Sequence, residues 1–130
     1  MERTTGILLP IFSLPSNQGI GDFGKHTYRL IDAIAKQHIH IWQILPLNPV
    51  GYGNSPYQPY SSFAGDELYI SIDTLADYGL LKQSSIRNYN KFSERVDYEG
   101  VRKFKEPYLR KAFKTFQKNF HEFEQEYQLF

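Results

Sequence analysis

The sequence predicts an α/β fold in which two parallel strands, joined by a helix, are followed by an aromatic-rich helical segment. Three observations predict it. Residues 6–12 and 39–47 are continuous apolar runs, typical of strands that are covered on both faces. Between these runs, apolar residues recur at helical spacing, and aromatic residues recur at helical spacing from Val101 onward.

The helix between the two strands is predicted to begin just after Asp22, whose carboxylate is expected to cap the first turn. Residues three or four positions apart then share one stripe of the helix: Tyr28, Ile31, Ile34, Ala35 and His38. A strand, a helix and a strand within about forty residues form a βαβ unit with parallel strands. Pro10 is expected near a strand end, because proline cannot donate to a sheet ladder.

Residues 48–65 are rich in Gly, Pro, Ser and Tyr, and they are predicted to form a long, ordered loop. A stretch of that length without regular structure is usually functional or disordered, and its prolines and aromatic residues argue against disorder. Residues 68–72 alternate and are predicted to form a further strand. Asp73 is then expected to cap a short helix at 74–78, which Gly79 closes.

The rest of the chain divides into a polar stretch, residues 82–98, and a helical segment that runs from Val101 to the C-terminus. Pro107 is expected to kink that helix or to start a second one. We therefore divide the chain into two parts. Residues 1–81 hold the first βα units with the loop 48–65, and residues 82–130 hold the polar connector and the amphipathic helical segment.

Composition indicates a folded, soluble protein of one ordinary domain. The chain has 130 residues, of which 41% are hydrophobic and 22% are charged. A net charge of +1 gives no general attraction to nucleic acid or membrane, and no apolar run approaches the roughly 20 residues of a membrane span. The absence of cysteine and of a signal-like N-terminus favours a cytoplasmic location.

Three further patterns are better explained by structure than by chemistry. Residues 19–24 match G-x-G-x-x-G, but Gln43 stands where a dinucleotide site needs an acidic residue, so no cofactor is predicted. Residues 82–118 hold eleven Lys and Arg against four Asp and Glu, which favours a solvated helix surface over an RNA-binding face. No metal is predicted either, since the histidines lack metal-like spacing with carboxylates: His26, His38, His40 and His121.

The side chains of the loop 48–65 suit a sugar. Sugars present apolar C–H faces and a fringe of hydroxyls, and tyrosine offers a flat apolar face with a hydroxyl at its rim. Such aromatic faces and further amide and hydroxyl groups come from Tyr52, Asn54, Ser55, Tyr57, Gln58 and Tyr60. Composition alone leaves two alternatives open, a sugar-binding loop and a rigid, packed Ω-loop.

Ordered motifs carry a family resemblance. R-x-x-G-I-L-L-P-x-x-S-L-P, G-I-G-D-F-G and W-Q-I-L-P-L-N-P-x-G-Y-G-N-S-P-Y-Q follow one another between Arg3 and Gln58, and R-V-D-Y occupies 95–98. The chain resembles the opening of amylomaltases and plant disproportionating enzymes, glycoside hydrolase family 77. The resemblance implies a (β/α)8 TIM-type barrel, of which this chain holds the first βα units, an incomplete barrel. The loops after both strands are then expected on the catalytic face.

The resemblance also implies a function, 4-α-glucanotransferase activity. Such enzymes transfer α-1,4-glucan segments between maltooligosaccharides by a retaining double displacement that needs two carboxylates. In the family these carboxylates lie far downstream, so no catalytic residue is assigned here. Asp22, Asp66, Glu67 and Asp73 are expected to be caps or surface residues.

The resemblance assigns substrate-binding roles to four residues of the loop. Ser55 and Tyr57 match the residues that hold sugar units near the cleavage point, with Asn54 beside them. Tyr52 matches a residue of a second glucan groove, whose other aromatic falls near Arg102 in this sequence.

Two functional hypotheses follow. The chain is either the N-terminal, substrate-binding part of a 4-α-glucanotransferase or a stand-alone module that binds maltooligosaccharides without catalysis. Under either hypothesis, a few strands of a barrel leave bare edges and an uncovered sheet face. The isolated chain is therefore expected to associate with itself.

Overall fold

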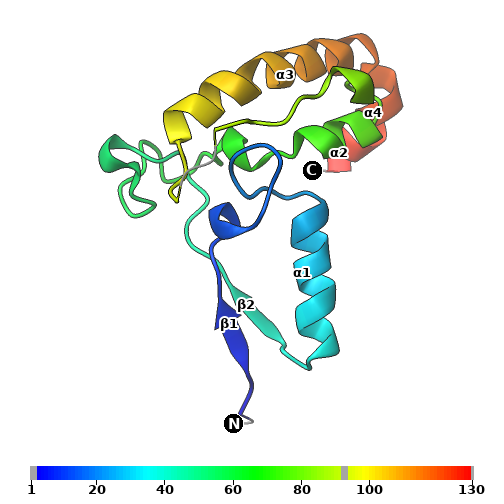
Figure 1. The fold of residues 1–130 in the computed structure, drawn as a ribbon. Coiled ribbons are helices and arrows are strands. Elements are labelled where there is room, and N and C mark those ends of the chain that lie inside the picture. The colour runs from blue at the N-terminus through cyan, green and yellow to red at the C-terminus, as the bar shows by residue number, and fades with distance from the viewer. Residues whose placement is uncertain (1–2, 92–93, 130) are drawn as a thin grey trace.

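The structure, a computed structural model, describes residues 3–91 and 94–129. Strands β1 (Gly6–Leu8) and β2 (Ile41–Gln43) pair in parallel, and helix α1 (Lys25–Lys36) connects them and lies along one side of the sheet (Figure 1). Gly6 lies opposite Ile41, and Leu8 lies opposite Gln43. The predicted βαβ unit is confirmed.

Both strands are shorter and more exposed than the sequence predicts. Ile7 and Trp42 share one face of the sheet and are half-buried, whereas Leu8 and Ile41 share the other face and are exposed. The prediction that both faces are covered is wrong for the residues described, because no element among them packs over Leu8 and Ile41. As predicted, Pro10 lies just beyond the strand end, where it precedes a 3-10 turn, Ile11–Ser13.

Helix α1 begins differently from the prediction. Gly24 is its N-cap, and no side chain caps the first turn. Asp22 is not the cap, because its carboxylate lies 3.5 Å from the Nζ of Lys105, 83 residues further along the chain. The backbone oxygen of Asp22 accepts a 2.6 Å hydrogen bond from the hydroxyl of Thr27, which ties the start of α1 to the preceding loop.

No strand forms at residues 68–72. The chain instead makes a 3-10 turn, Glu67–Tyr69, and then helix α2 (Ile72–Asp77), whose N-cap is Ser71 rather than Asp73. The hydroxyl oxygen of Ser71 accepts from the backbone N–H of Thr74. At the other end the predicted role of Gly79 is confirmed. Its φ is +74°, and its N–H and that of the next residue bond back into the helix.

Helices α3 (Tyr98–Lys118) and α4 (Phe120–Leu129) form the C-terminal segment. Of the two outcomes expected at Pro107, the start of a second helix is wrong, because α3 runs through the proline and α4 begins after Asn119. The helix continues through the proline because Phe104 and Tyr108, on either side of it, pack into the core. Residues 82–98 contain a single 3-10 turn in their described part, Gln83–Ser85. No helix in the described ranges is long and apolar enough to cross a membrane.

Among the described residues, the hydrophobic core has two clusters, and α3 contributes to both. One contains Ile20, Leu68, Tyr89 and Val101, and the other contains Ile72, Leu80, Leu81 and Ala112. Phe104 packs against both clusters. Residues from 1–81 and from 82–130 therefore share one core, while the division between them stays a prediction.

Candidate functional site

The loop 48–65 is tied together by its own backbone. Gly51 N–H donates to the oxygen of Gln58 over 3.0 Å, and Tyr60 N–H donates to the oxygen of Pro49 over 3.1 Å. At its base, Asp66 N–H donates to the oxygen of Leu47 over 2.7 Å. The loop is therefore irregular and ordered, as predicted.

The tip of the loop is a tight turn, Tyr52–Asn54, with two residues in the left-handed region. Gly53 has φ +81° and Asn54 has φ +54°, and these are residue types that adopt this region at low cost. After the turn, the hydroxyl oxygen of Ser55 accepts from the N–H of Tyr57 over 3.3 Å. This local bond fixes the spacing between the two residues that the resemblance assigns to sugar binding.

The aromatic side chains of the loop point into solvent. Tyr52 is 96% exposed and Tyr57 is 70% exposed, and Tyr60 and Phe63 are also exposed. Large aromatic side chains usually bury much of their surface in a folded protein. Aromatic faces held open on an ordered loop are available for stacking against a ligand.

A cavity of about 700 Å³ lies next to this loop. Its walls come from three places: the segment after β1, with Phe12 and Ser13; the loop tip, with Asn54; and the stretch before α3, with Tyr89 and Tyr98. The segments that follow the two strands thus meet at one end of the sheet. Of the four predicted binding residues, Asn54 lines this cavity, whereas Tyr52, Ser55 and Tyr57 lie outside its lining.

An ionised carboxylate forms part of the cavity wall. Asp97 accepts hydrogen bonds from Gly100 N–H over 2.9 Å and from the Tyr89 hydroxyl over 2.8 Å. These bonds, together with the nearby charge of Lys91, lower the pKa of Asp97 below its ordinary value. The sequence pattern R-V-D-Y marks this segment but does not reveal the contact with Tyr89.

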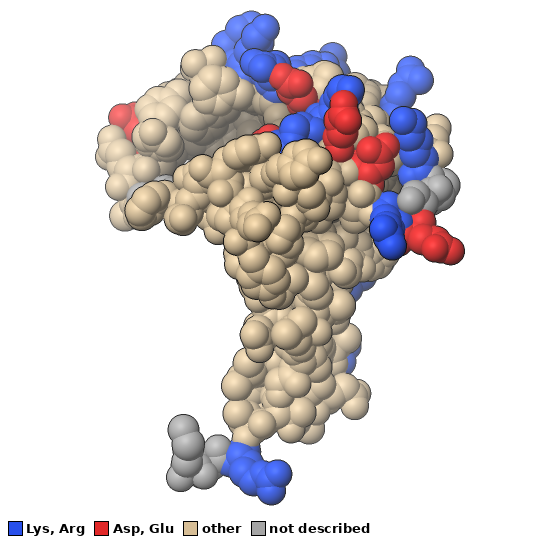
Figure 2. Space-filling model, turned by 90° about the vertical axis from the view of Figure 1, so that its left-hand side faces the viewer, with Lys and Arg blue, Asp and Glu red and all other residues tan. Residues whose placement is uncertain are grey.

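The loop and the strands around it carry no charge. Residues 37–65 contain no Lys, Arg, Asp or Glu. Figure 2 shows that charged side chains gather over the upper part of one face of the molecule, and that most of the surface below them is uncharged. A neutral ligand with apolar faces and hydroxyl groups fits this surface better than an anion or a cation does. Among the described residues, no group of three or more His, Asp or Glu side chains could hold a metal ion.

Sequence reasoning missed a buried lysine beside the site. The side chain of Lys105 is fully buried, and its Nζ donates to the oxygen of Leu68 over 2.7 Å. Burial lowers the pKa of Lys105 and raises that of Asp22, while each charge opposes the shift of the other. A signal existed: Lys105 follows Val101 by four residues, so helical spacing places it on the buried stripe of α3.

The comparisons with known proteins agree on one family. The family model described as 4-alpha-glucanotransferase matches residues 9–130. The 4-alpha-glucanotransferase of Synechocystis sp. is 44% identical over 119 residues, which cover 91% of this chain and 24% of that protein. The 4-alpha-glucanotransferase of Streptococcus pneumoniae serotype 4 is 39% identical over 117 residues, which cover 88% of this chain and 23% of that protein.

A solved structure agrees as well. The amylomaltase from Streptococcus agalactiae, in complex with acarbose, matches with a TM-score of 0.83 and 35% sequence identity. The match covers 98% of this chain and 27% of that chain. The chain therefore spans about a quarter of the length of the proteins it matches.

Proposed function

The chain belongs to the 4-alpha-glucanotransferase family, and we propose that it forms the N-terminal part of an enzyme that transfers α-1,4-glucan segments between maltooligosaccharides. The family match over residues 9–130 supports this reading. In it, β1, α1 and β2 are the first βα units of a (β/α)8 barrel that the 130 residues do not complete. Among the described residues β1 and β2 pair only with each other, which is consistent with strands that belong to a larger sheet.

In this proposal the chain contributes substrate-binding contacts. The observation that carries it is the loop 48–65, an uncharged and backbone-tied segment that holds Tyr52 and Tyr57 exposed. Tyr57 and Ser55 contact a sugar unit near the cleavage point, and Asn54 assists from the cavity side. The complex of the S. agalactiae amylomaltase with acarbose supports a carbohydrate ligand for this fold.

The chemistry itself is assigned to residues outside this chain. A retaining transfer needs one carboxylate that attacks the anomeric carbon and a second acid that protonates the leaving oxygen. The two buried carboxylates beside the loop are engaged elsewhere. Asp22 pairs with Lys105, and Asp66 pairs with Arg102. Asp97, in the cavity wall, accepts hydrogen bonds from the Tyr89 hydroxyl and from Gly100 N–H. In this proposal none of the three acts as the nucleophile, and the 130 residues position a sugar without cleaving it.

Calorimetric titration with maltoheptaose tests the binding role. We expect the Tyr57→Ala chain to bind about tenfold more weakly than the wild type, the loss expected for one stacking contact worth about 1.4 kcal/mol. Tyr28→Ala is the matched control, because Tyr28 is also an exposed tyrosine but lies on α1, away from the loop. Equal affinities of the wild type and Tyr57→Ala for maltoheptaose would show that Tyr57 does not contact the sugar.

Incubation with maltotriose tests the assignment of chemistry. The isolated chain is expected to release neither glucose nor longer maltodextrins, because the family resemblance implies that the catalytic carboxylates lie downstream of these residues. Disproportionation above the background of a buffer blank would show that the nucleophile lies within these 130 residues. A stand-alone binding module would also bind sugar without turnover. To distinguish the two hypotheses, the chain is joined to the remainder of a family member and assayed for glucan transfer.

The remaining sequence-based expectations stay predictions. They are a cytoplasmic location and no role for nucleic acid, membrane, cofactor or metal. One similar relative, from Solanum tuberosum, is named as a chloroplastic or amyloplastic enzyme, and this chain is 37% identical to it over 117 residues.

A further inference from the structure

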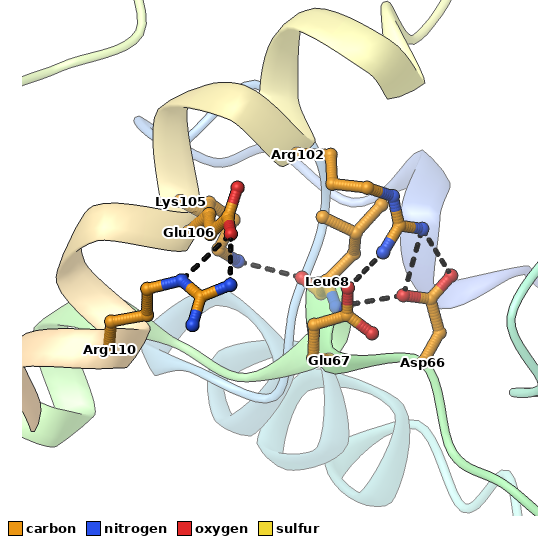
Figure 3. Close-up of polar contacts among 7 residues, drawn as sticks. All are labelled: Asp66, Glu67, Leu68, Arg102, Lys105, Glu106 and Arg110. Carbon is orange, nitrogen blue, oxygen red and sulfur yellow. Dashed lines mark hydrogen bonds and ion pairs between the residues drawn. The ribbon is translucent and has the colours of Figure 1, made fainter. Parts of the chain in front are cut away.

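The exit of the loop 48–65 is held by helix α3. Figure 3 shows Arg102 and Lys105 of α3 reaching toward the segment that leaves the loop, Asp66, Glu67 and Leu68. Arg102 Nη2 lies 3.3 Å from both carboxylate oxygens of Asp66, and its Nη1 pairs with Glu67. One guanidinium therefore binds two consecutive acidic residues.

Asp66 is the residue through which this contact reaches the loop. Its backbone N–H closes the loop base by donating to the oxygen of Leu47. Its side chain is 2% exposed, and its Oδ1 also accepts from the N–H of Leu68 over 3.0 Å. A buried carboxylate is stable only with a cation or several donors around it. Arg102 supplies that cation.

Lys105 holds the next turn of the same segment. Its Nζ donates to the backbone oxygen of Leu68 and lies 3.5 Å from the carboxylate of Asp22. Asp22 belongs to the segment after β1, and Leu68 follows the loop after β2. Two cations on adjacent turns of α3 thus fix the segments that follow both strands.

We propose that Arg102 and Lys105 are positioning residues for sugar binding. They hold the exit of the loop 48–65, so that Ser55 and Tyr57 are presented in one arrangement without either cation touching the sugar. The part of this inference that concerns sugar rests on the proposed function. The part that concerns the loop does not, because it follows from the contacts of Asp66 and Leu68.

A matched control lies on the same helix. Arg110 pairs with Glu106, one turn away, and both side chains are exposed (Figure 3). An exposed pair within one helix contributes little and holds no other segment. Arg102→Gln and Arg110→Gln make the same chemical change on α3, and Arg102→Gln alone is expected to release the loop.

Amide hydrogen exchange of the full chain, measured by NMR, tests whether Arg102 holds the loop 48–65. In Arg102→Gln the N–H groups of Gly51, Tyr60 and Asp66 are expected to exchange about tenfold faster than in the wild type. The N–H of Leu9, which bonds to Gln43 in the sheet, reports on the rest of the molecule and is expected to be unchanged. Arg110→Gln is expected to change none of the four, and Arg102→Lys to restore part of the protection.

Two results would overturn the proposal. In the first, the loop amides of Arg102→Gln stay as protected from exchange as in the wild type. In the second, the amide of Leu9 loses as much protection as the loop amides do, which would mean that Arg102 stabilises the whole fold. Maltoheptaose affinity is the second readout, expected to fall about tenfold in Arg102→Gln and to stay unchanged in Arg110→Gln. If the wild-type chain binds no maltoheptaose, the proposed function fails, whereas the exchange data still decide whether α3 holds the loop.

Discussion

At the scale of single residues, Tyr69 is a partly buried phenol whose pKa is shifted by its surroundings. It lies in the 3-10 turn that follows the loop, and its ring meets that of Phe23 edge to face, with 6.3 Å between the centroids. Burial raises the pKa of Tyr69 to about 12, and the charges of Tyr98 and Asp66 add to the shift. In the unfolded chain the same hydroxyl ionises near its ordinary value of about 10.

The first prediction follows from that difference. Above about pH 10 the unfolded chain loses the phenol proton while the folded chain keeps it, so stability falls as pH rises from about 10 to 12. Tyr69→Phe removes this ionisation, and its free energy of unfolding is expected to fall less steeply over that range. Urea unfolding of both proteins at a series of pH values measures the two slopes. Parallel slopes would mean that Tyr69 ionises freely in the folded state.

At the scale of elements, the sequence predicts the features that depend on residues close together in the chain. It does not predict those that depend on contacts between residues far apart in the chain. The βαβ unit, the ordered loop and the turn at Gly79 follow from local spacing and local residue types. The strand expected at residues 68–72 fails because the side chain of Asp66 bonds to Leu68 N–H and turns the chain into a 3-10 helix. The cap expected at Asp22 fails because its partner, Lys105, comes from α3.

The site also has features that the sequence predicts and features that it does not. The exposure of Tyr52 and Tyr57 agrees with the composition of the loop, whereas the roles of Ser55 and Tyr57 in sugar binding rest on family resemblance and stay predictions. The contact of Arg102 with Asp66 could not be predicted, because an arginine on a helix gives no sign of which distant carboxylate it meets. Its partner, Asp66, lies 36 residues earlier in the chain.

The start of α2 gives a prediction at this scale. Ser71 caps the helix in the structure, whereas the sequence favoured Asp73. Ser71→Ala is expected to lower the free energy of unfolding by about 1 kcal/mol, the usual loss for a serine cap. Asp73→Ala removes a first-turn charge alone and is expected to cost about 0.5 kcal/mol or less. Urea unfolding measures the loss of stability in each variant. A larger loss in Asp73→Ala than in Ser71→Ala would indicate that Asp73 is the cap.

At the scale of the whole molecule, one face of the sheet is the main feature still without a partner among the described residues. Leu8 and Ile41 lie diagonally across the two strands on this face, and both are exposed. Each strand also pairs along one edge alone, since the sheet formed by residues 3–91 and 94–129 has two strands. An apolar surface next to unpaired strand edges favours association with a second sheet.

Self-association of the 130-residue chain is the prediction at this scale. Sedimentation velocity is expected to show a dimer or a larger assembly that shifts toward monomer in the double variant Leu8→Lys, Ile41→Lys. Tyr28→Lys, a new lysine on α1, is the control and is expected to leave the assembly intact. A wild-type chain that sediments as a monomer and unfolds cooperatively would contradict the prediction.

The pairing of β1 with β2 has an optical consequence. Trp42, the single tryptophan of the chain, lies in β2, and its indole N–H donates to the backbone oxygen of Leu9, the residue after β1, over 2.9 Å. Its fluorescence therefore reports on the contact between the two strands. Separation of the strands frees the indole to bond to water, and a shift of its emission to longer wavelength would signal that event without any added label.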